Sequence, residues 1–372
     1  MGTIFPETFI DMKKALFLMM AAAILSIGTA DAKKSKKEAK DYIFPTQEEG
    51  WVKANPEKYG YDREKLKELK NYIIKKTRAT GMVVIVGGEQ IFSYGAIDRN
   101  SYIASCRKSV LAMMYGKYVE NGTINLKETI GDLGIDDIGG LLPIEKKATV
   151  DNLITARSGV YHDASNPGYD LKNRPERGTK KPGEFFLYNN WDFNAAGTVF
   201  EMKTGKNIYD ALEEDIVLPI GMQDWDRSIQ KKGGNLKVSQ HPAYHFRFST
   251  RDMARIGYLM LRNGNWNGNQ VISEKWVKKI TSVVSPASEV GHGSKDPRHA
   301  YGYMWWLINP EWSKFRPELE GGYEAHGAMG QYICVYPAID MVVAIKTDSI
   351  YGRKIGNGAR NNIIERLLDC KM

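Results

Sequence analysis

The chain has 372 residues, of which 42% are hydrophobic and 26% charged, and its formal net charge is +8. This length is enough for one large domain or two intimate domains with an ample core. The composition is typical of a soluble globular enzyme. No internal repeat, glycine-rich phosphate loop or nucleic-acid motif is present, so the sequence gives no support to repeat, nucleotide-loop or nucleic-acid-binding proteins.

The first 32 residues have the pattern of a secretory signal peptide. A cationic start at Met12–Lys14 precedes an apolar stretch over Ala15–Ile27, and Ala30–Ala32 matches the small-residue cleavage pattern. The apolar stretch is shorter than the ~20 residues of a membrane-spanning helix. We therefore expect cleavage without stable membrane insertion; an uncleaved N-terminal anchor is the alternative. A lysine-rich linker over residues 33–48 follows, and the mature chain is expected in the periplasm or outside the cell.

Hydrophobic periodicity predicts the order of helices and strands. Helical spacing occurs over residues 62–78, 109–119, 151–156, 194–204, 208–217, 251–262 and 360–368. Strand-like runs occur over residues 82–87, 90–95, 301–308, 331–336 and 341–347. This order predicts an α+β fold in which both ends of the chain contribute strands to one antiparallel sheet flanked by helices. Residues 49–140 and 250–372 would form the α/β part, and residues 141–249 a mainly helical insert.

Ser105 and Lys108 form an S-x-x-K motif directly before an apolar helix pattern. Residues three apart on a helix share a face, so the lysine amine can lie beside the serine hydroxyl and serve as its base. The helix N-terminus would also direct the Ser105 N–H toward a bound carbonyl oxygen. A second S-x-x-K begins at Ser228 in a polar stretch without this setting. The alternative for Ser105 is a helix N-cap with a solvated Lys108.

Two further motifs can complete a site for acyl transfer. Tyr188 and Asn190 form the only Y-x-N of the chain; a phenol beside a cation can shuttle protons, and the amide can hold the lysine and a substrate. The run from His326 to Gly330 precedes an apolar strand pattern, and a backbone N–H there could complete an oxyanion hole with that of Ser105. The alternatives are a core tyrosine and a glycine-rich turn with a surface histidine.

These motifs, in this order, resemble the serine β-lactamase/penicillin-binding superfamily. The closest likeness is to its class C β-lactamase-like branch, which includes esterases, D-amino-acid peptidases and 6-aminohexanoate-dimer hydrolases. Three further segments match that branch: Leu153–Val160 is similar to LLTHTSGL, Pro182–Asn190 to PG-x-x-F-x-YSN, and Tyr301–Trp306 to YGYGWW. The resemblance covers most of the mature chain and implies the β-lactamase/transpeptidase-like fold.

The resemblance also implies roles for single residues. Ser105 would be the nucleophile, and Lys108 and Tyr188 would share the base and acid work. Asn190 would position the substrate, and the N–H groups of Ser105 and Met329 would form the oxyanion hole. His326 stands where the superfamily has the lysine of its K-T-G box. The box here reads His-Gly-Ala, and it lacks the fixed charge and the hydroxyl that grip a β-lactam carboxylate.

No cofactor or catalytic metal is expected. His241 and His245 have helical ligand spacing, but Pro242 interrupts them and no third ligand is evident. Asp296 and His299 are interpreted as loop residues near His292.

The sequence thus predicts an exported serine hydrolase of carboxylesterase or amidase type, which cleaves a small ester, amide or peptide through an acyl-enzyme on Ser105. The alternatives are D-Ala peptidase or β-lactamase activity, and a non-catalytic sensor or scaffold on the same fold.

Overall fold

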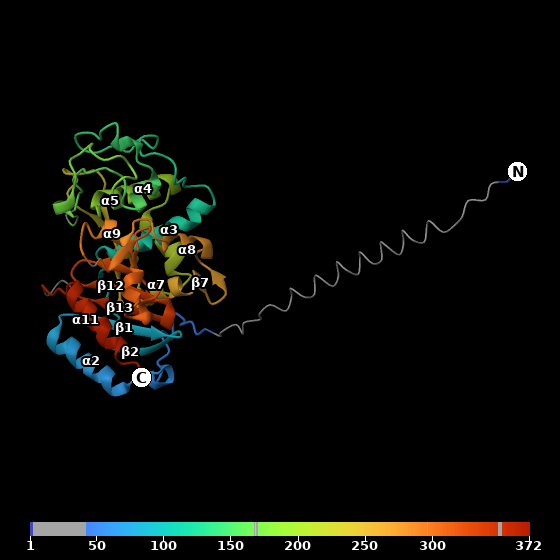
Figure 1. Cartoon of the computed structure of the whole chain (residues 1–372), viewed down its shortest axis with the longest axis vertical. Coiled ribbons are helices and arrows are strands. Elements are labelled where there is room, and N and C mark those ends of the chain that lie inside the picture. The colour runs from blue at the N-terminus through green and yellow to red at the C-terminus, as the bar shows by residue number, and fades with distance from the viewer. Residues whose placement is uncertain (3–41, 167, 169, 296, 349–351) are drawn as a thin grey trace. The chain divides into compact units, whose positions relative to one another are not determined.

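The computed structural model describes residues 1–2, 42–166, 168, 170–295, 297–348 and 352–372. The predicted signal peptide, apart from its first two residues, and most of the lysine-rich linker lie outside the described residues. Residues Ile43–Met372 form one unit, to which all elements named below belong (Figure 1). Among the described residues, no helix has both the length and the apolar character needed to cross a membrane.

A seven-stranded antiparallel sheet forms the centre of this unit. The strands follow the order β2-β1-β13-β12-β11-β10-β9 across the sheet. The N-terminal and C-terminal parts of the chain meet where β1 pairs with β13, with Met82 opposite Ile345. The strands are β1 Gly81–Val86, β2 Glu89–Gly95, β9 His299–Tyr301, β10 Trp306–Ile308, β11 Tyr323–Gly327, β12 Gln331–Tyr336 and β13 Met341–Lys346. The prediction of one antiparallel sheet built from both ends of the chain is confirmed.

Helices cover both faces of the sheet, and this explains why its central strands are apolar without alternation. Alternate residues of β1 enter two different cores, as Val83 and Met82 illustrate. Helix α7 (Thr250–Leu261) packs on the face of Val83, whereas α2 (Arg63–Lys76) and α11 (Asn357–Leu368) pack on the face of Met82 (Figure 1).

Residues 141–249 combine helices with long stretches that are neither helix nor strand, and Figure 1 shows these helices at the end of the unit away from α2. The longest is α5 (Asn190–Thr204), which packs against α4 (Val150–Ile154) and α3 (Cys106–Glu120). The other α-helices among the described residues are α6 Ile208–Leu212, which continues into a π-turn over Glu213–Val217, α8 Glu274–Ile280, α9 Ala287–Val290 and α10 Pro310–Ser313. Three small pairs of strands complete the unit: β3 Ser101–Tyr102 with β6 Arg247–Phe248, β4 Lys231–Gly233 with β5 Ala243–His245, and β7 Asn265–Trp266 with β8 Asn269–Gln270.

The structure changes the sequence-based assignment of strands at two places. The single strand predicted over residues 301–308 is a hairpin of β9 and β10, because the chain turns at Met304, whose φ is +58°. His326 precedes β12 as predicted, but it lies within a strand that the sequence analysis did not identify, β11, and is paired with Tyr332 of β12, so the alternative of a glycine-rich turn with a surface histidine is wrong. A smaller error concerns α5, which begins at Asn190, four residues before its predicted start, because the Asn189 side chain caps it by accepting from the Trp191 N–H.

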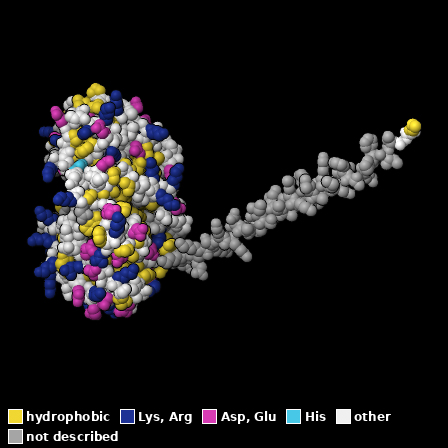
Figure 2. Space-filling view, in the orientation of Figure 1, with side chains coloured by type: hydrophobic (Ala, Val, Ile, Leu, Met, Phe, Trp, Pro, Cys, Tyr) yellow, Lys and Arg dark blue, Asp and Glu magenta, His cyan; other side chains and the backbone are white. Residues whose placement is uncertain are grey.

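Charged side chains of both signs are interspersed over the face that Figure 2 shows. A surface of mixed sign does not attract a polyanion over a large area.

Candidate active site

Ser105 lies at the N-terminal end of α3, in the turn that enters the helix. The preceding Ala104 has a φ of +49°, and Ser105 itself makes no side-chain capping bond. The Ser105 hydroxyl therefore does not cap the helix, which was the alternative to a catalytic role. Lys108, one turn further along, is buried rather than solvated.

Lys108 Nζ is the centre of the polar contacts at this site. It lies 3.0 Å from Ser105 Oγ, 2.6 Å from Tyr188 Oη and 2.6 Å from Asn190 Oδ1. The carboxamide oxygen of Asn190 can only accept, so one lysine N–H is fixed toward it. The structure thus brings together the four residues that the S-x-x-K and Y-x-N motifs singled out.

The environment of Lys108 favours its neutral form. Burial lowers the pKa of Lys108 well below its usual value, and the neighbouring Arg107 guanidinium lowers it further. Arg107 is itself buried, donates to Asn194 Oδ1 at 2.8 Å and lies over the Tyr244 ring. A neutral amine beside a hydroxyl has a lone pair that can take the hydroxyl proton.

Tyr188 is held by aromatic neighbours as well as by Lys108. Its ring lies edge-on to Tyr301 at 6.2 Å and contacts Phe193 at 5.1 Å and Trp306 at 5.3 Å between centroids. Burial raises the pKa of Tyr188, although the Ser105 hydrogen bond and Arg107 act in the opposite direction. The phenol therefore keeps its proton at neutral pH and can pass it on.

The region before β12 carries a possible second donor for an oxyanion. Gly327 of β11 approaches the start of α3 so closely that a Cβ on it would lie 2.5 Å from the Ile103 carbonyl oxygen. Met329 follows with a φ of +66° and lines the same cavity as Ser105. Among the described residues, neither the Ser105 N–H nor the Met329 N–H donates to a protein acceptor. Both are therefore available to a bound carbonyl oxygen.

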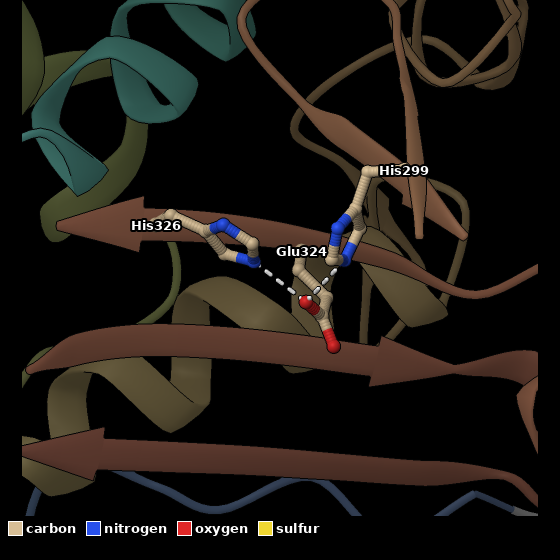
Figure 3. A group of neighbouring side chains, drawn as sticks. All are labelled: His299, Glu324 and His326. Carbon is tan, nitrogen blue, oxygen red and sulfur yellow. Dashed lines mark hydrogen bonds and ion pairs between the residues drawn. The ribbon is translucent and has the colours of Figure 1, made fainter. Parts of the chain in front are cut away.

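His326 is not on the surface but is partly buried, in a cluster around the buried Glu324 that sequence reasoning missed (Figure 3). Its Nε2 lies 2.6 Å from Glu324 Oε2, and the same oxygen accepts from Arg360 Nη1 at 2.5 Å and lies 3.0 Å from His299 Nε2. Tyr336 Oη donates to the other carboxylate oxygen at 2.7 Å. The spacing Glu-x-His on a strand, which puts both side chains on one face, is the signal that could have revealed the pair.

The charges of this cluster are fixed by Arg360. Burial alone would raise the pKa of Glu324, but Arg360 and the two imidazoles outweigh it and hold this pKa well below its usual value. Burial, followed by Arg360, lowers the pKa of His326 to about 3, although Glu324 opposes both. His326 is therefore a neutral imidazole at pH 7, beside an ionised carboxylate.

The site opens into a cavity of about 580 Å³. Ser105, Tyr188, Asn190, His326 and Met329 all line it. Its size is in the range of sites for small molecules. All six predicted site residues are thus in or beside one cavity, since Lys108 contacts three of its lining groups from behind.

The other candidate residues lie elsewhere. Ser228 is exposed and donates to Asp226 Oδ1 at 2.6 Å instead of contacting a lysine. His241 lies 2.9 Å from the Asp136 carbonyl oxygen, and it belongs to no cluster of metal-ligating residues among those the structure describes. Asp296 is outside the described residues. His299 was wrongly interpreted as a loop residue, because it lies in β9 and contacts Glu324.

His299, Glu324 and His326 are the described residues whose arrangement could hold a metal ion, because one ligand atom of each lies within 4.8 Å of the others. The Glu324 oxygen they share already accepts from Arg360. A guanidinium at this distance repels a divalent cation and occupies part of the carboxylate. The cluster therefore suits an internal hydrogen-bond network better than a metal.

Comparisons with known proteins show the family and the fold of the chain. Residues 69–365 match the sequence profile of the family described as Beta-lactamase. The 6-aminohexanoate-dimer hydrolase of Paenarthrobacter ureafaciens is 20% identical over 303 residues, which are 73% of this chain and 72% of that protein. Among solved structures, a candidate 6-aminohexanoate-dimer hydrolase from Bacillus anthracis has a TM-score of 0.62 at 19% identity and covers 87% of this chain and 88% of its own. A mutant class C β-lactamase has a TM-score of 0.61 at 14% identity, and the match covers 82% of this chain and 96% of that β-lactamase.

Proposed function

Because the chain belongs to the Beta-lactamase family and is a serine hydrolase, we propose that it cleaves a small ester or amide through an acyl-enzyme on Ser105. The observation that carries the proposal is the contact of Lys108 Nζ with Ser105 Oγ and Tyr188 Oη inside the cavity. The name of the amide hydrolase among the relatives supports an amide as one substrate class.

The proposed reaction begins with attack of Ser105 Oγ on the substrate carbonyl carbon. The neutral Lys108 amine takes the hydroxyl proton as the C–O bond forms, and the N–H groups of Ser105 and Met329 stabilise the oxyanion. Tyr188 donates its proton to the departing oxygen or nitrogen, and the lysine proton replaces it. Collapse of the tetrahedral intermediate breaks the bond to the leaving group and leaves an ester on Ser105.

Hydrolysis of the acyl-enzyme uses the same groups in the reverse order. A water loses its proton to the Lys108/Tyr188 pair as its oxygen adds to the acyl carbon. The Ser105 oxygen then leaves and recovers a proton from the pair, and the carboxylic acid is released. Asn190 holds the lysine in place through its carboxamide oxygen, and its amide nitrogen lies 3.4 Å from the Asn166 carbonyl oxygen, at the edge of the same cavity.

Labelling with an active-site phosphonate tests the assignment. We expect peptide mapping to find the label on Ser105, Ser105→Ala to abolish turnover with an unchanged melting temperature, and the matched control Ser228→Ala to remain active. A label on Ser228, or an active preparation that takes no label, would contradict the mechanism. A non-catalytic sensor would be acylated without turnover. Screening para-nitrophenyl esters, short amides, a D-Ala-D-Ala peptide and a chromogenic cephalosporin then separates the substrate classes.

Export is a second part of the proposal and rests on the sequence of Met12–Ala32. The mature protein would act in the periplasm or outside the cell. Mass spectrometry of the protein from its native cells should find an N-terminus at or near Lys33. An intact cytosolic chain that starts at Met1 or Met12 would contradict export without affecting the proposed chemistry.

A further inference from the structure

The contact between Glu324 and His326 determines which ring nitrogen of His326 carries the proton. Glu324 is ionised, since Arg360 Nη1 donates to its Oε2 at 2.5 Å, and an ionised carboxylate can only accept. His326 Nε2, 2.6 Å from the same oxygen, is therefore the protonated nitrogen. In a neutral imidazole the other nitrogen, Nδ1, then has a bare lone pair.

The position of this lone pair is fixed by packing. The His326 ring stacks on Trp306 with an interplanar angle of 13° and lies edge-on to Tyr332 and His299. Figure 3 shows its Nε2 turned toward Glu324 and its other ring nitrogen turned away. Among the described residues, His326 Nδ1 has no hydrogen-bond partner, and the ring lines the cavity that contains Ser105.

We propose that His326 Nδ1 is a fixed hydrogen-bond acceptor in the substrate site, which selects substrates that carry an N–H donor beside the scissile bond. This inference rests on the proposed function and deepens it. Glu324 is the positioning residue, because it fixes the tautomer without touching the substrate. A substrate carboxylate at this place would meet a lone pair instead of a donor, whereas an amide or amine N–H would gain a hydrogen bond.

The nearest fixed cation of the cavity lining, Arg107, does not contact His326. Its side chain contacts Asn194 of α5 and Tyr244 of β5, whereas His326 contacts residues of β9, β10, β11 and β12. Arg107 and His326 are thus held by different elements, although both side chains line the cavity and Arg107 Nη1 has no hydrogen-bond partner among the described residues. A metal ion held by His299, Glu324 and His326 would require the loss of the Nε2 protons that the two imidazoles now direct at Glu324. It would also lie beside the Arg360 guanidinium, which donates to the same carboxylate oxygen.

The first experiment reads the tautomer without using activity. Two-bond proton–nitrogen correlation spectra of the full-length protein, labelled with nitrogen-15 in histidine, should show His326 as the Nε2–H tautomer at pH 7. Glu324→Gln should lower the population of the Nε2–H tautomer of His326 or make the Nδ1–H tautomer the major one. The melting curve of this variant shows whether it is folded. An Nδ1–H tautomer, or a doubly protonated ring in the wild type, would overturn the inference.

The second experiment measures the preference with matched substrates. On the acyl side, para-nitrophenyl N-acetylglycinate is compared with para-nitrophenyl levulinate, in which CH2 replaces the N–H. On the alcohol side, the butyrate ester of N-acetylethanolamine is compared with its ketone analogue. The ratio of kcat/KM within each pair is then compared between the wild type and His326→Phe, which keeps a ring against Trp306 but removes the acceptor. Intrinsic reactivity cancels in this comparison.

On one of the two sides, the wild type should favour the N–H substrate by about 3- to 10-fold more than His326→Phe does, the range expected for one hydrogen bond. His326→Lys should instead improve turnover of the mono-para-nitrophenyl ester of succinic acid relative to the levulinate.

Equal ratios in wild type and His326→Phe on both sides would overturn the inference while leaving the hydrolase intact. Stoichiometric zinc that is lost in His299→Phe would overturn it in favour of a metal site. If neither these esters nor the short amides of the screen are hydrolysed, the proposed function fails, and the tautomer measurement still decides the role of Glu324.

Discussion

Replacement of Glu324 by glutamine should destabilise the protein through the charge that it leaves behind. Arg360 is fully buried and donates to Glu324, and no other carboxylate forms an ion pair with it among the described residues. Removal of one partner of a buried ion pair costs ~3–5 kcal/mol, because the remaining charge is left without compensation. This is a large part of the ~5–15 kcal/mol by which native proteins are stable.

The expected change in melting temperature follows from the size of the unit. About 330 residues, Ile43–Met372, unfold with an entropy of roughly 2.1 cal/mol/K per residue, so the melting temperature should fall by about 4–7 °C. Scanning calorimetry of wild type, Glu324→Gln, Arg360→Met and the double variant measures this. The double variant should lose less than the sum of the single variants, because it leaves no unpaired charge.

The pH dependence gives a further check with a definite sign. The folded-state pKa of Glu324 lies well below its usual value of 4.5, so its contribution to stability is fully present above pH 4.5. The contribution is lost as the pH falls through the folded-state pKa. The difference in melting temperature between wild type and Glu324→Gln should therefore shrink in acid. A difference below 1 °C at pH 7, or one that grows in acid, would refute the role of this charge.

Four further outcomes are expected. Because burial and Arg107 keep Lys108 neutral, a pH–rate profile should show that kcat/KM falls in acid as Lys108 gains a proton. Lys108→Met should lower kcat/KM by roughly 10²–10⁴-fold at pH 7. Efficiency on a para-nitrophenyl butyrate should exceed that on a chromogenic cephalosporin by at least one to two powers of ten, because the His-Gly-Ala box offers the β-lactam carboxylate no cation; equal efficiencies would contradict this, and a gain of cephalosporin hydrolysis by His326→Lys would support it. Prolonged chelation should leave ester hydrolysis unchanged, and a loss that zinc alone restores would contradict the absence of a catalytic metal. Gly257→Ala should lower the free energy of unfolding by ~1–3 kcal/mol, and with it the melting temperature, because a Cβ there would lie 2.5 Å from Val342 Cγ1. An unchanged melting curve would contradict this and show that β13 moves aside.

The sequence by itself determined the residues whose relation is local. Ser105 and Lys108 are one helical turn apart, and any α-helix that begins there brings them together. The apolar runs of β1, β12 and β13 are buried on both faces, and such strands are recognisable without knowledge of their partners. The chain order of the motifs was then enough to indicate the family and the antiparallel sheet.

Only the tertiary structure decided the state of His326. The strand β11 was not recognised, because its sequence Tyr-Glu-Ala-His-Gly places a charged residue where a core residue is expected. Glu324 can be buried there only because Arg360, 36 positions later in the chain, and His299, 25 positions earlier, converge on it. Periodicity reports the contacts of residues a few positions apart, whereas the free energy of a buried charge depends on partners that the fold brings from distant segments. For that reason the candidate catalytic residues Ser105 and Lys108 could be found from their spacing, and the network that orients His326 could not.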